Sequence, residues 1–418
     1  METDLFGNPA SFVFTGKTAT YSAGRGELFH DWFPYLEGFS SEFVKDILSQ
    51  KFDSPKRILE PFCGVGTTPL TLAQMGISCG YCEVNPFLLE LVNAKSSLLQ
   101  LDAAELQSLS MGLLELNHNL NSYLKAAEAS AELLSAFSET FGEVQYFSEP
   151  NKTLVLKLKT IENQHVEEKL RPFFRVVVAT SLLKSSLLRR AGDVRYKTKR
   201  ELAEGIPDIL PLIETKIQII CRDIKIISEI RARGAMHLVC DNAKKLSQIS
   251  GKKFDGVITS PPYLNGTNYI RNTKLELWFL GYLNGKQDMR HFRESVVTSA
   301  INDVSKTSGV NVIDEAADIV KKIESNCYDK RIPRMVSAYF EHMKQVSNGI
   351  YKNVRKNAPV CIDIGDSVYG GEHVPTHDIL EDIFKSVGFN SEGSVVLRKR
   401  FSNQGAPLTQ RLLFFRKK

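Results

Sequence analysis

The sequence lacks the hallmarks of a membrane or secreted protein. None of its apolar runs approaches the ~20 residues that a transmembrane helix needs. The first residues, METDLFGNPASFVF, have neither the basic start nor the apolar block of a signal peptide. The seven cysteines are odd in number and scattered, which argues against a disulfide framework. We therefore expect a cytoplasmic protein with reduced thiols and no membrane association.

Patterns that bind metal ions are also scarce. Cys79 and Cys82 form a C-x-x-C pair, but no second ligand pair occurs at the spacing that a structural zinc site requires. The pair lies in GISCGYCEVN, a stretch typical of a short buried strand. His373 and His377 lie four residues apart without an evident third ligand. We expect no metal site, and we expect both cysteines to be small buried residues.

The length, 418 residues, exceeds one ordinary core and suits two domains or one large domain with insertions. Apolar content of 43% and charged content of 24% are ordinary for a globular protein. The net charge of +5 is modest, but residues 184–200 carry seven Lys/Arg against one Asp. Taken alone, this basic run is typical of a solvated helix end and loop. The alternative is a stripe that contacts phosphates of nucleic acid.

The order of apolar patterns predicts an α/β fold with a Rossmann-like, doubly wound sheet. Strand-like and helix-like runs alternate from the RILE stretch to about residue 101, which indicates a β-α-β-α beginning. Long helical patterns follow over 102–232, which we interpret as a mostly helical insertion. Strand-like runs return over 233–418. Within that last part, residues 284–330 are polar and weakly periodic, and they are predicted to form helices and loops.

The first strand–helix turn carries a candidate nucleoside site. EPFCGVGTT places Gly64 and Gly66 where a tight turn and close approach of a ligand need glycine. Glu83 ends the next strand, where a carboxylate can accept hydrogen bonds from ribose hydroxyls. Pro69 replaces the third glycine of the dinucleotide fingerprint, which favours S-adenosylmethionine over a dinucleotide. Asp241 ends the HLVCD strand and could meet an adenine amine or cap the next helix.

A second candidate site follows the strand FDGVIT. Pro261 and Pro262 have no N–H, so the carbonyls of Ser260 and Pro261 are available to accept hydrogen bonds from an amino group. Tyr263 offers a flat face on which a heterocycle can stack. Two acceptors beside one aromatic ring suit the exocyclic amine of a planar base. The alternative interpretation is a strand that ends in a proline turn.

Together, EPFCGVGTT and TSPPYLNGTNYIRNTKLELWFLG resemble the DNA amino-methyltransferases, which methylate N4 of cytosine or N6 of adenine. Phe62, Gly64 and Gly66 match the F-x-G-x-G motif, and residues 260–263 match the catalytic [S/N/D]-P-P-[Y/F/W] motif. The stretch before the first motif resembles the family segment that closes over the methionine end of the cofactor, although its aromatic–Pro signature is altered to FSS at 39–41. The resemblance covers about 1–100 and 235–418.

The resemblance implies direct methyl transfer from S-adenosylmethionine to a base flipped out of the duplex. Serine at the first motif position favours N4 of cytosine over the alternative, N6 of adenine. A C5-cytosine enzyme would need a cysteine after a proline, and the sequence contains no Pro-Cys pair. The implied catalytic residues are Ser260, Pro261, Pro262 and Tyr263, and the candidate cofactor-binding residues are Phe62, Gly64, Gly66, Thr67, Glu83 and Asp241.

The resemblance implies that residues 1–101 and 233–418 form the two parts of a catalytic domain that binds S-adenosylmethionine. Double-stranded DNA is the implied partner, and a cognate restriction endonuclease is a further candidate partner. The helical insertion 102–232 is a candidate DNA-binding part, and residues 284–330, expected over the active face, are a candidate DNA-contacting segment. The basic run gains weight as a DNA contact, and the candidate residues are Arg189, Arg190, Arg195, Lys197, Lys199, Arg200 and Arg271. Asp363 and Asp366 are interpreted as structural caps. Methylation of RNA or of a protein glutamine, and a catalytically inactive DNA-binding subunit, remain rival hypotheses.

Overall fold

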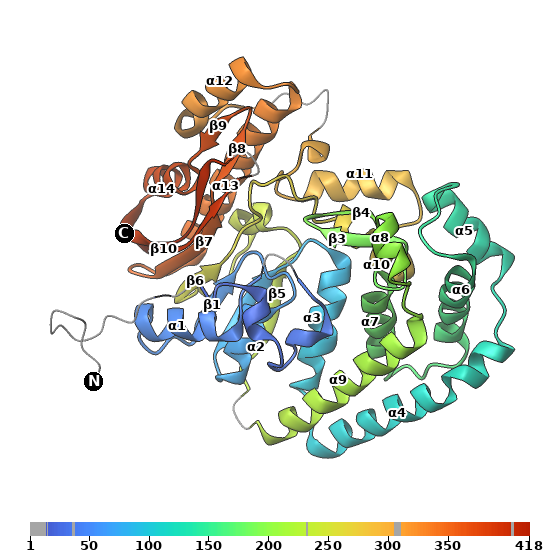
Figure 1. Ribbon diagram of the computed structural model, residues 1–418. Coiled ribbons are helices and arrows are strands. Elements are labelled where there is room, and N and C mark those ends of the chain that lie inside the picture. The colour runs from blue at the N-terminus through green and yellow to red at the C-terminus, as the bar shows by residue number, and fades with distance from the viewer. Residues whose placement is uncertain (1–13, 15, 36–37, 231–232, 305–310, 403–404) are drawn as a thin grey trace.

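The computed structural model describes residues 14, 16–35, 38–230, 233–304, 311–402 and 405–418 (Figure 1). Within them, the centre is a seven-stranded sheet of order β10-β11-β7-β6-β1-β2-β5. Neighbouring strands from β5 to β7 all pair in parallel. The strands are β1 (Arg57–Glu60), β2 (Ser78–Cys82), β5 (Met236–Cys240), β6 (Gly256–Thr259), β7 (Pro359–Gly365), β10 (Phe389–Phe401) and β11 (Pro407–Lys417).

The predicted α/β fold is confirmed, with one difference at the end of the chain. Strand β11 pairs antiparallel with both β10 and β7, so the sheet is mixed rather than wholly parallel. Strand β10 ends at Phe401 and β11 begins at Pro407, whereas a parallel neighbour would need a crossover of a dozen or more residues. The short spacing between the two apolar runs is therefore the physical reason for the antiparallel edge.

Helices cover both faces of the sheet because its strands are apolar on both faces. Ile58 and Ile258 face helix α1 (Ser41–Lys51) and helix α2 (Thr67–Gln74). Leu59 and Val257 alternate with them and face helix α13 (Arg331–Asn353) and helix α14 (Thr376–Val387). Successive side chains of a strand point to opposite faces, so near-continuous apolar runs bury both sides.

The chain between β2 and β5 is mostly helical and lies on the right of Figure 1. One continuous apolar core joins α3, α4, α6, α7 and α9 to α10 (Lys274–Phe279), which follows β6 in the chain. The basic run forms an antiparallel hairpin, β3 and β4, instead of the expected helix end and loop. The elements are α3 (Pro86–Leu98), α4 (Ala103–Ala126), α5 (Ala131–Phe141), α6 (Glu149–Gln164), α7 (Arg171–Leu182), β3 (Leu188–Ala191), β4 (Asp193–Tyr196), α8 (Lys199–Ala203) and α9 (Ile209–Glu229).

Short elements complete the chain. Before α13 come α11 (Lys286–Ser295) and α12 (Ala317–Asn326), and a small sheet of β8 (Ser367–Tyr369) and β9 (Glu372–Val374) follows β7. The 3₁₀ turns are η1 (Tyr21–Gly24), η2 (His30–Trp32), η3 (Ala243–Gln248), η4 (Arg271–Thr273), η5 (Ile301–Asp303) and η6 (Asp314–Ala316). In the described part of the chain, no helix combines the length and apolarity needed to cross a bilayer.

Candidate active site

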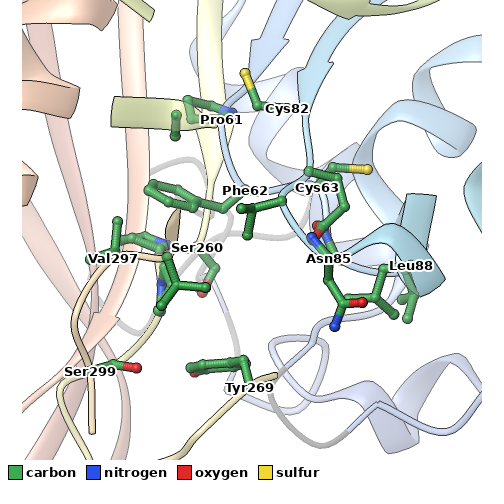
Figure 2. A pocket seen from close by; sticks show the side chains of 18 of the residues that line it. Pro61, Phe62, Cys63, Cys82, Asn85, Leu88, Ser260, Tyr269, Val297 and Ser299 are labelled. Carbon is green, nitrogen blue, oxygen red and sulfur yellow. The ribbon is translucent and has the colours of Figure 1, made fainter. Parts of the chain in front are cut away.

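A cavity lies where the carboxyl ends of β1, β2 and β6 meet, at the edge of the sheet expected for ligand binding in an open α/β fold. The space amounts to about 1060 Å³, open solvent at its mouth included. Figure 2 shows Ser260 and Val297 on one side of it and Asn85 and Leu88 on the other, with Phe62 between them. Both sequence motifs therefore open into one cavity, and their predicted residues that line it are Phe62, Gly64, Thr67, Glu83, Ser260, Pro261, Pro262 and Tyr263.

The glycine turn after β1 has the strained geometry that its sequence predicts. Gly64 has φ +55° and Gly66 has φ +89°, values in the left-handed region that favour glycine. Gly64 lines the cavity, whereas Gly66 is the N-cap of α2 and an added Cβ there would lie 3.0 Å from Val92. The buried Lys95 donates a hydrogen bond from Nζ to the Val65 carbonyl at 2.8 Å. Lys95, which sequence reasoning missed, thus fixes the turn from the side of α3.

Glu83 holds the turn from the side of β2. Its Oε2 accepts a hydrogen bond from the Gly64 N–H at 2.7 Å, and its Oε1 accepts one from the Asn85 N–H at 2.8 Å. Burial raises the pKa of Glu83 to about 7. A carboxylate oxygen has two lone pairs, so each oxygen that accepts one N–H retains capacity for a hydroxyl of a ligand in the cavity.

The Ser260–Tyr263 stretch follows β6 directly and presents Tyr263 to the cavity. The Tyr263 hydroxyl donates to Asp363 Oδ2 at 2.9 Å and accepts from Gln410 Nε2 at 3.0 Å. Gln410 also donates to both oxygens of Asp363 at 2.9 Å, and burial raises the pKa of Asp363 to about 7. The interpretation of Asp363 as a structural cap is therefore wrong, because its carboxyl group fixes the ring of Tyr263.

The chain that follows α11 forms another wall of the cavity. The Gly266 N–H donates to the Ser299 carbonyl at 3.0 Å, and the Ser299 hydroxyl donates to the Thr267 carbonyl at 3.1 Å. Asn268 Nδ2 donates to Asp303 Oδ1 at 3.0 Å, and burial raises the pKa of Asp303 to about 6. The loop after the Pro-Pro pair is thus tied to a distant part of the chain, and Ser299 and Asp303 line the cavity. No local sequence signal identified either residue.

Tyr35 is a further cavity residue that motif reasoning did not single out. An added Cβ at Gly64 would lie 3.5 Å from the Tyr35 ring, so this ring faces the glycine turn. The chain before it is anchored to α9, because Asp223 Oδ2 accepts the Phe29 N–H and the Trp32 indole N–H, each at 2.8 Å. Helix α9 therefore helps to position the segment that carries Tyr35.

Asp241 does not occupy the predicted cofactor position. Its side chain is 70% exposed and pairs with Lys245 at 3.2 Å, and within the described chain it is the following residues, Asn242 and Ala243, that line the cavity. Asn242 also supplies the side chain that caps η3. The predicted strand end is confirmed, and the residue after Asp241 is the one that lines the cavity.

Most cations of the basic run are engaged within the protein. Arg189 and Arg195 both pair with Glu201, at 2.7 and 2.8 Å. Arg190 donates to the Asn272 carbonyl at 2.8 Å and Lys197 donates to the Ser186 carbonyl at 2.6 Å.

These bonds fold the hairpin and dock it beside η4, where Arg271 pairs with Asp193 at 3.1 Å. Lys199 and Arg200 are exposed. The predicted DNA-contacting cations therefore form two groups. Those of the hairpin and Arg271 have partners within the protein, whereas Lys199 and Arg200 are exposed at the start of α8.

Three cysteines, Cys79, Cys82 and Cys240, lie on the neighbouring strands β2 and β5. Cys79 and Cys82 are both buried, and Cys82 Sγ lies 3.0 Å from Cys240 Sγ on the neighbouring strand. Across the described residues, no group of three or more His, Cys, Asp or Glu side chains is placed to hold a metal ion.

Comparison with known proteins identifies similar methyltransferases. The chain is 26% identical to the Type II methyltransferase M.BsoBI of Geobacillus stearothermophilus over 434 residues, which span 94% of this chain and 84% of the relative. It is 24% identical to the Type II methyltransferase M.AvaI of Nostoc sp. over 420 residues, which span 91% and 83%. The similarity therefore extends into the helical segment, which the two motifs did not cover.

Other comparisons are less informative. No protein-family model matches the sequence. Among solved structures, the rRNA methyltransferase aviRa from Streptomyces viridochromogenes aligns with 92% of this chain and 87% of its own, at 9% identity and a TM-score of 0.34.

Proposed function

We propose that this protein is an S-adenosylmethionine-dependent DNA methyltransferase that modifies the exocyclic N4 amine of cytosine. The observation that carries the proposal is the shared cavity, into which the Gly64 turn, Glu83 and the Ser260–Tyr263 stretch all open. The similarity to two Type II methyltransferases over nearly the whole chain supports the reaction class.

The residues present fit the cofactor. The turn offers a cradle next to Tyr35, since a Cβ at Gly64 would enter the space between the turn and that ring. Glu83 would accept hydrogen bonds from ribose hydroxyls, and Asn242 would meet the adenine end. When bound, the cofactor would supply a methyl group from its positively charged sulfur: the amine nitrogen gains the N–C bond as the S–C bond breaks, and the amine then releases one proton to solvent.

The opposite part of the cavity suits a planar base with an amino group. Tyr263 is held by two hydrogen bonds at its hydroxyl, so its ring is a fixed surface for stacking. The amine would donate hydrogen bonds to the Ser260 hydroxyl and to the Pro261 carbonyl, which orients its lone pair. Catalysis in this arrangement rests on orientation and on fixed dipoles, and no covalent enzyme intermediate is needed.

Cytosine N4 is the proposed target because Ser260 stands at the first position of the motif. A hydroxyl can serve either base, so adenine N6 is the second candidate. Two other functions would replace the proposal if the test fails: methylation of RNA, and DNA binding by a catalytically inactive subunit.

The test is expression in a bacterial host that lacks its own DNA methylation, followed by sequencing of the genome with modification-sensitive reads. We expect N4-methylcytosine within one short sequence context in cells that express the native chain. We expect none in cells that express Ser260→Ala at the same level. A fully unmodified genome, with soluble protein that binds S-adenosylhomocysteine, would reject the proposed function.

A further inference from the structure

A second open groove, outside the central cavity, gathers cations from separate parts of the chain. Arg25 follows η1, Lys184 follows α7, Lys216 belongs to α9 and Arg398 belongs to β10. The space amounts to about 1410 Å³, open solvent included, and hydroxyl side chains such as that of Thr180 also line it. These residues are far apart in sequence, and of the four cations only Lys184 belongs to the basic run 184–200.

The positive charge of this groove is poorly neutralised. Among its described lining residues the carboxylate is that of Asp31, which pairs with Arg222 at 3.3 Å. Lys216 donates to the backbone carbonyl of Asp31 at 2.6 Å, so it gains no counter-charge from this bond. Burial, and then the nearby charge of Lys184, lower the pKa of Lys216 to about 8. The negative charge of Asp31 opposes this decrease only in part, so an anion bound beside Lys184 and Lys216 would relieve the remaining repulsion.

The remaining cations of the groove are available to a ligand. Arg25, Lys184 and Arg398 are exposed, and in the described chain none of them forms an ion pair. This distinguishes the groove from the β3–β4 hairpin, where Arg189 and Arg195 share Glu201. The larger unpaired positive charge thus lies in the groove rather than on the hairpin that the sequence pointed to.

The groove adjoins the central cavity. Tyr35 lines both, with its ring facing Gly64 on the cavity side. A polymer with one base in the cavity must carry its backbone across the surface around the cavity, and through Tyr35 the groove is part of that surface. Arg, Lys and hydroxyl side chains are the groups that contact phosphate and sugar in protein–DNA interfaces.

We propose that the groove of Arg25, Lys184, Lys216 and Arg398 binds backbone phosphates of the DNA strand whose base enters the central cavity. This inference rests on the proposed function. It assigns the main electrostatic contact to residues from four distant segments, and it gives the hairpin cations a mainly structural role.

The test is fluorescence anisotropy of a labelled duplex, with Kd measured at several salt concentrations for the native chain and for Lys184→Ala, Arg398→Ala and their combination. Each lost phosphate contact should reduce the slope of log K against log salt by about 0.9, so the double variant should lose nearly 2. The matched control is Lys125→Ala on α4, an exposed lysine away from the groove, for which we expect an unchanged slope. Calorimetry with S-adenosylhomocysteine should give native affinity in every variant, which excludes misfolding.

Two further arms separate the outcomes. Arg189→Ala with Arg195→Ala should change the slope less than the groove variants do, and a larger change there would overturn the proposal. Competition by inorganic phosphate at constant ionic strength should be weak; strong, saturable competition with no loss of DNA affinity in the groove variants would assign a small anion instead. If the DNA remains unmethylated while DNA binding by the groove variants depends less on salt, the groove proposal is supported and the proposed function fails. If methylation proceeds and the slopes are all native, the groove proposal fails alone.

Discussion

The hydroxyl of Tyr263 offers a sharp test of how the site is built. Tyr263→Phe keeps the ring and removes the bond to Asp363 at 2.9 Å and the bond from Gln410 at 3.0 Å. In this variant the carboxyl oxygens of Asp363 still accept hydrogen bonds from Gln410 Nε2 at 2.9 Å, so the buried carboxyl group keeps a partner. We expect the free energy of unfolding to fall by about 1–2 kcal/mol, the lower part of the range for bonds to buried carboxyl groups.

The same site predicts a dependence on pH. Burial raises the pKa of Asp363 from its ordinary value of 3.8 to about 7, so the native state binds more protons than the unfolded state between those values. The contribution of Asp363 to stability is therefore present at low pH and is lost as the pH rises through 7. The resulting decrease in the free energy of unfolding is at most roughly 4 kcal/mol, because each unit of difference between the folded and unfolded pKa is worth about 1.36 kcal/mol. Asp363→Asn should flatten this part of the profile.

The assay is chemical denaturation of the native chain, Tyr263→Phe and Asp363→Asn at pH 5 and pH 8, together with the methylation rate. The control is Tyr328→Phe, because Tyr328 is 87% exposed and its hydroxyl is solvated in both states. A loss of 1–2 kcal/mol in ring positioning corresponds to a rate decrease of roughly 5- to 30-fold. Native stability and native rate in Tyr263→Phe would refute the positioning role of Asp363.

The remaining predictions concern the glycine turn and its carboxylate. Glu83→Gln should weaken S-adenosylhomocysteine binding by roughly 10-fold or more in calorimetry, because a hydrogen bond to a charged group is worth about 1.5–3 kcal/mol, whereas Asp241→Asn should leave the affinity native. Burial raises the pKa of Glu83 to about 7, and its ionised form is the better acceptor of hydroxyl bonds, so the affinity should rise from pH 6 to pH 8 in the native chain and stay flat in Glu83→Gln. Gly66→Ala should lower the free energy of unfolding by about 1–2 kcal/mol in denaturant titrations, since φ is +89° and the new Cβ would lie 3.0 Å from Val92; native stability would contradict the left-handed turn.

The parts of the site that could be predicted from sequence are those that follow a strand end. Gly64, Glu83 and Ser260 each come directly after a short apolar run, and the carboxyl ends of parallel strands meet at one edge of the sheet. Strand order and composition therefore suffice to bring these residues together. The same reasoning placed the end of β5 correctly but selected Asp241 rather than the next residue, because strand periodicity does not fix the exposed end to one position.

The parts that could not be predicted depend on contacts between distant segments. Asp363 and Gln410 lie 100 and 147 residues from Tyr263, and they meet its hydroxyl only because β7 and β11 pair beside β6. The β3–β4 hairpin has strands of four residues each, too short for a clear alternation among so many cations. A charge count along the chain also cannot show that Arg189 is already paired with Glu201.

The most direct test of the central claim is the position of a labelled methyl group. Purified protein would be incubated with duplex DNA and S-adenosylmethionine that carries an isotopically labelled methyl, and the DNA would be digested to nucleosides for mass spectrometry. We predict label on N4 of deoxycytidine, and none in the Ser260→Ala reaction. Label on N6 of deoxyadenosine would support the binding of an exocyclic amine by Ser260 and Pro261 but would change the target base to adenine. Label on carbon 5 of cytosine, or label in RNA or protein alone, would contradict the proposed function.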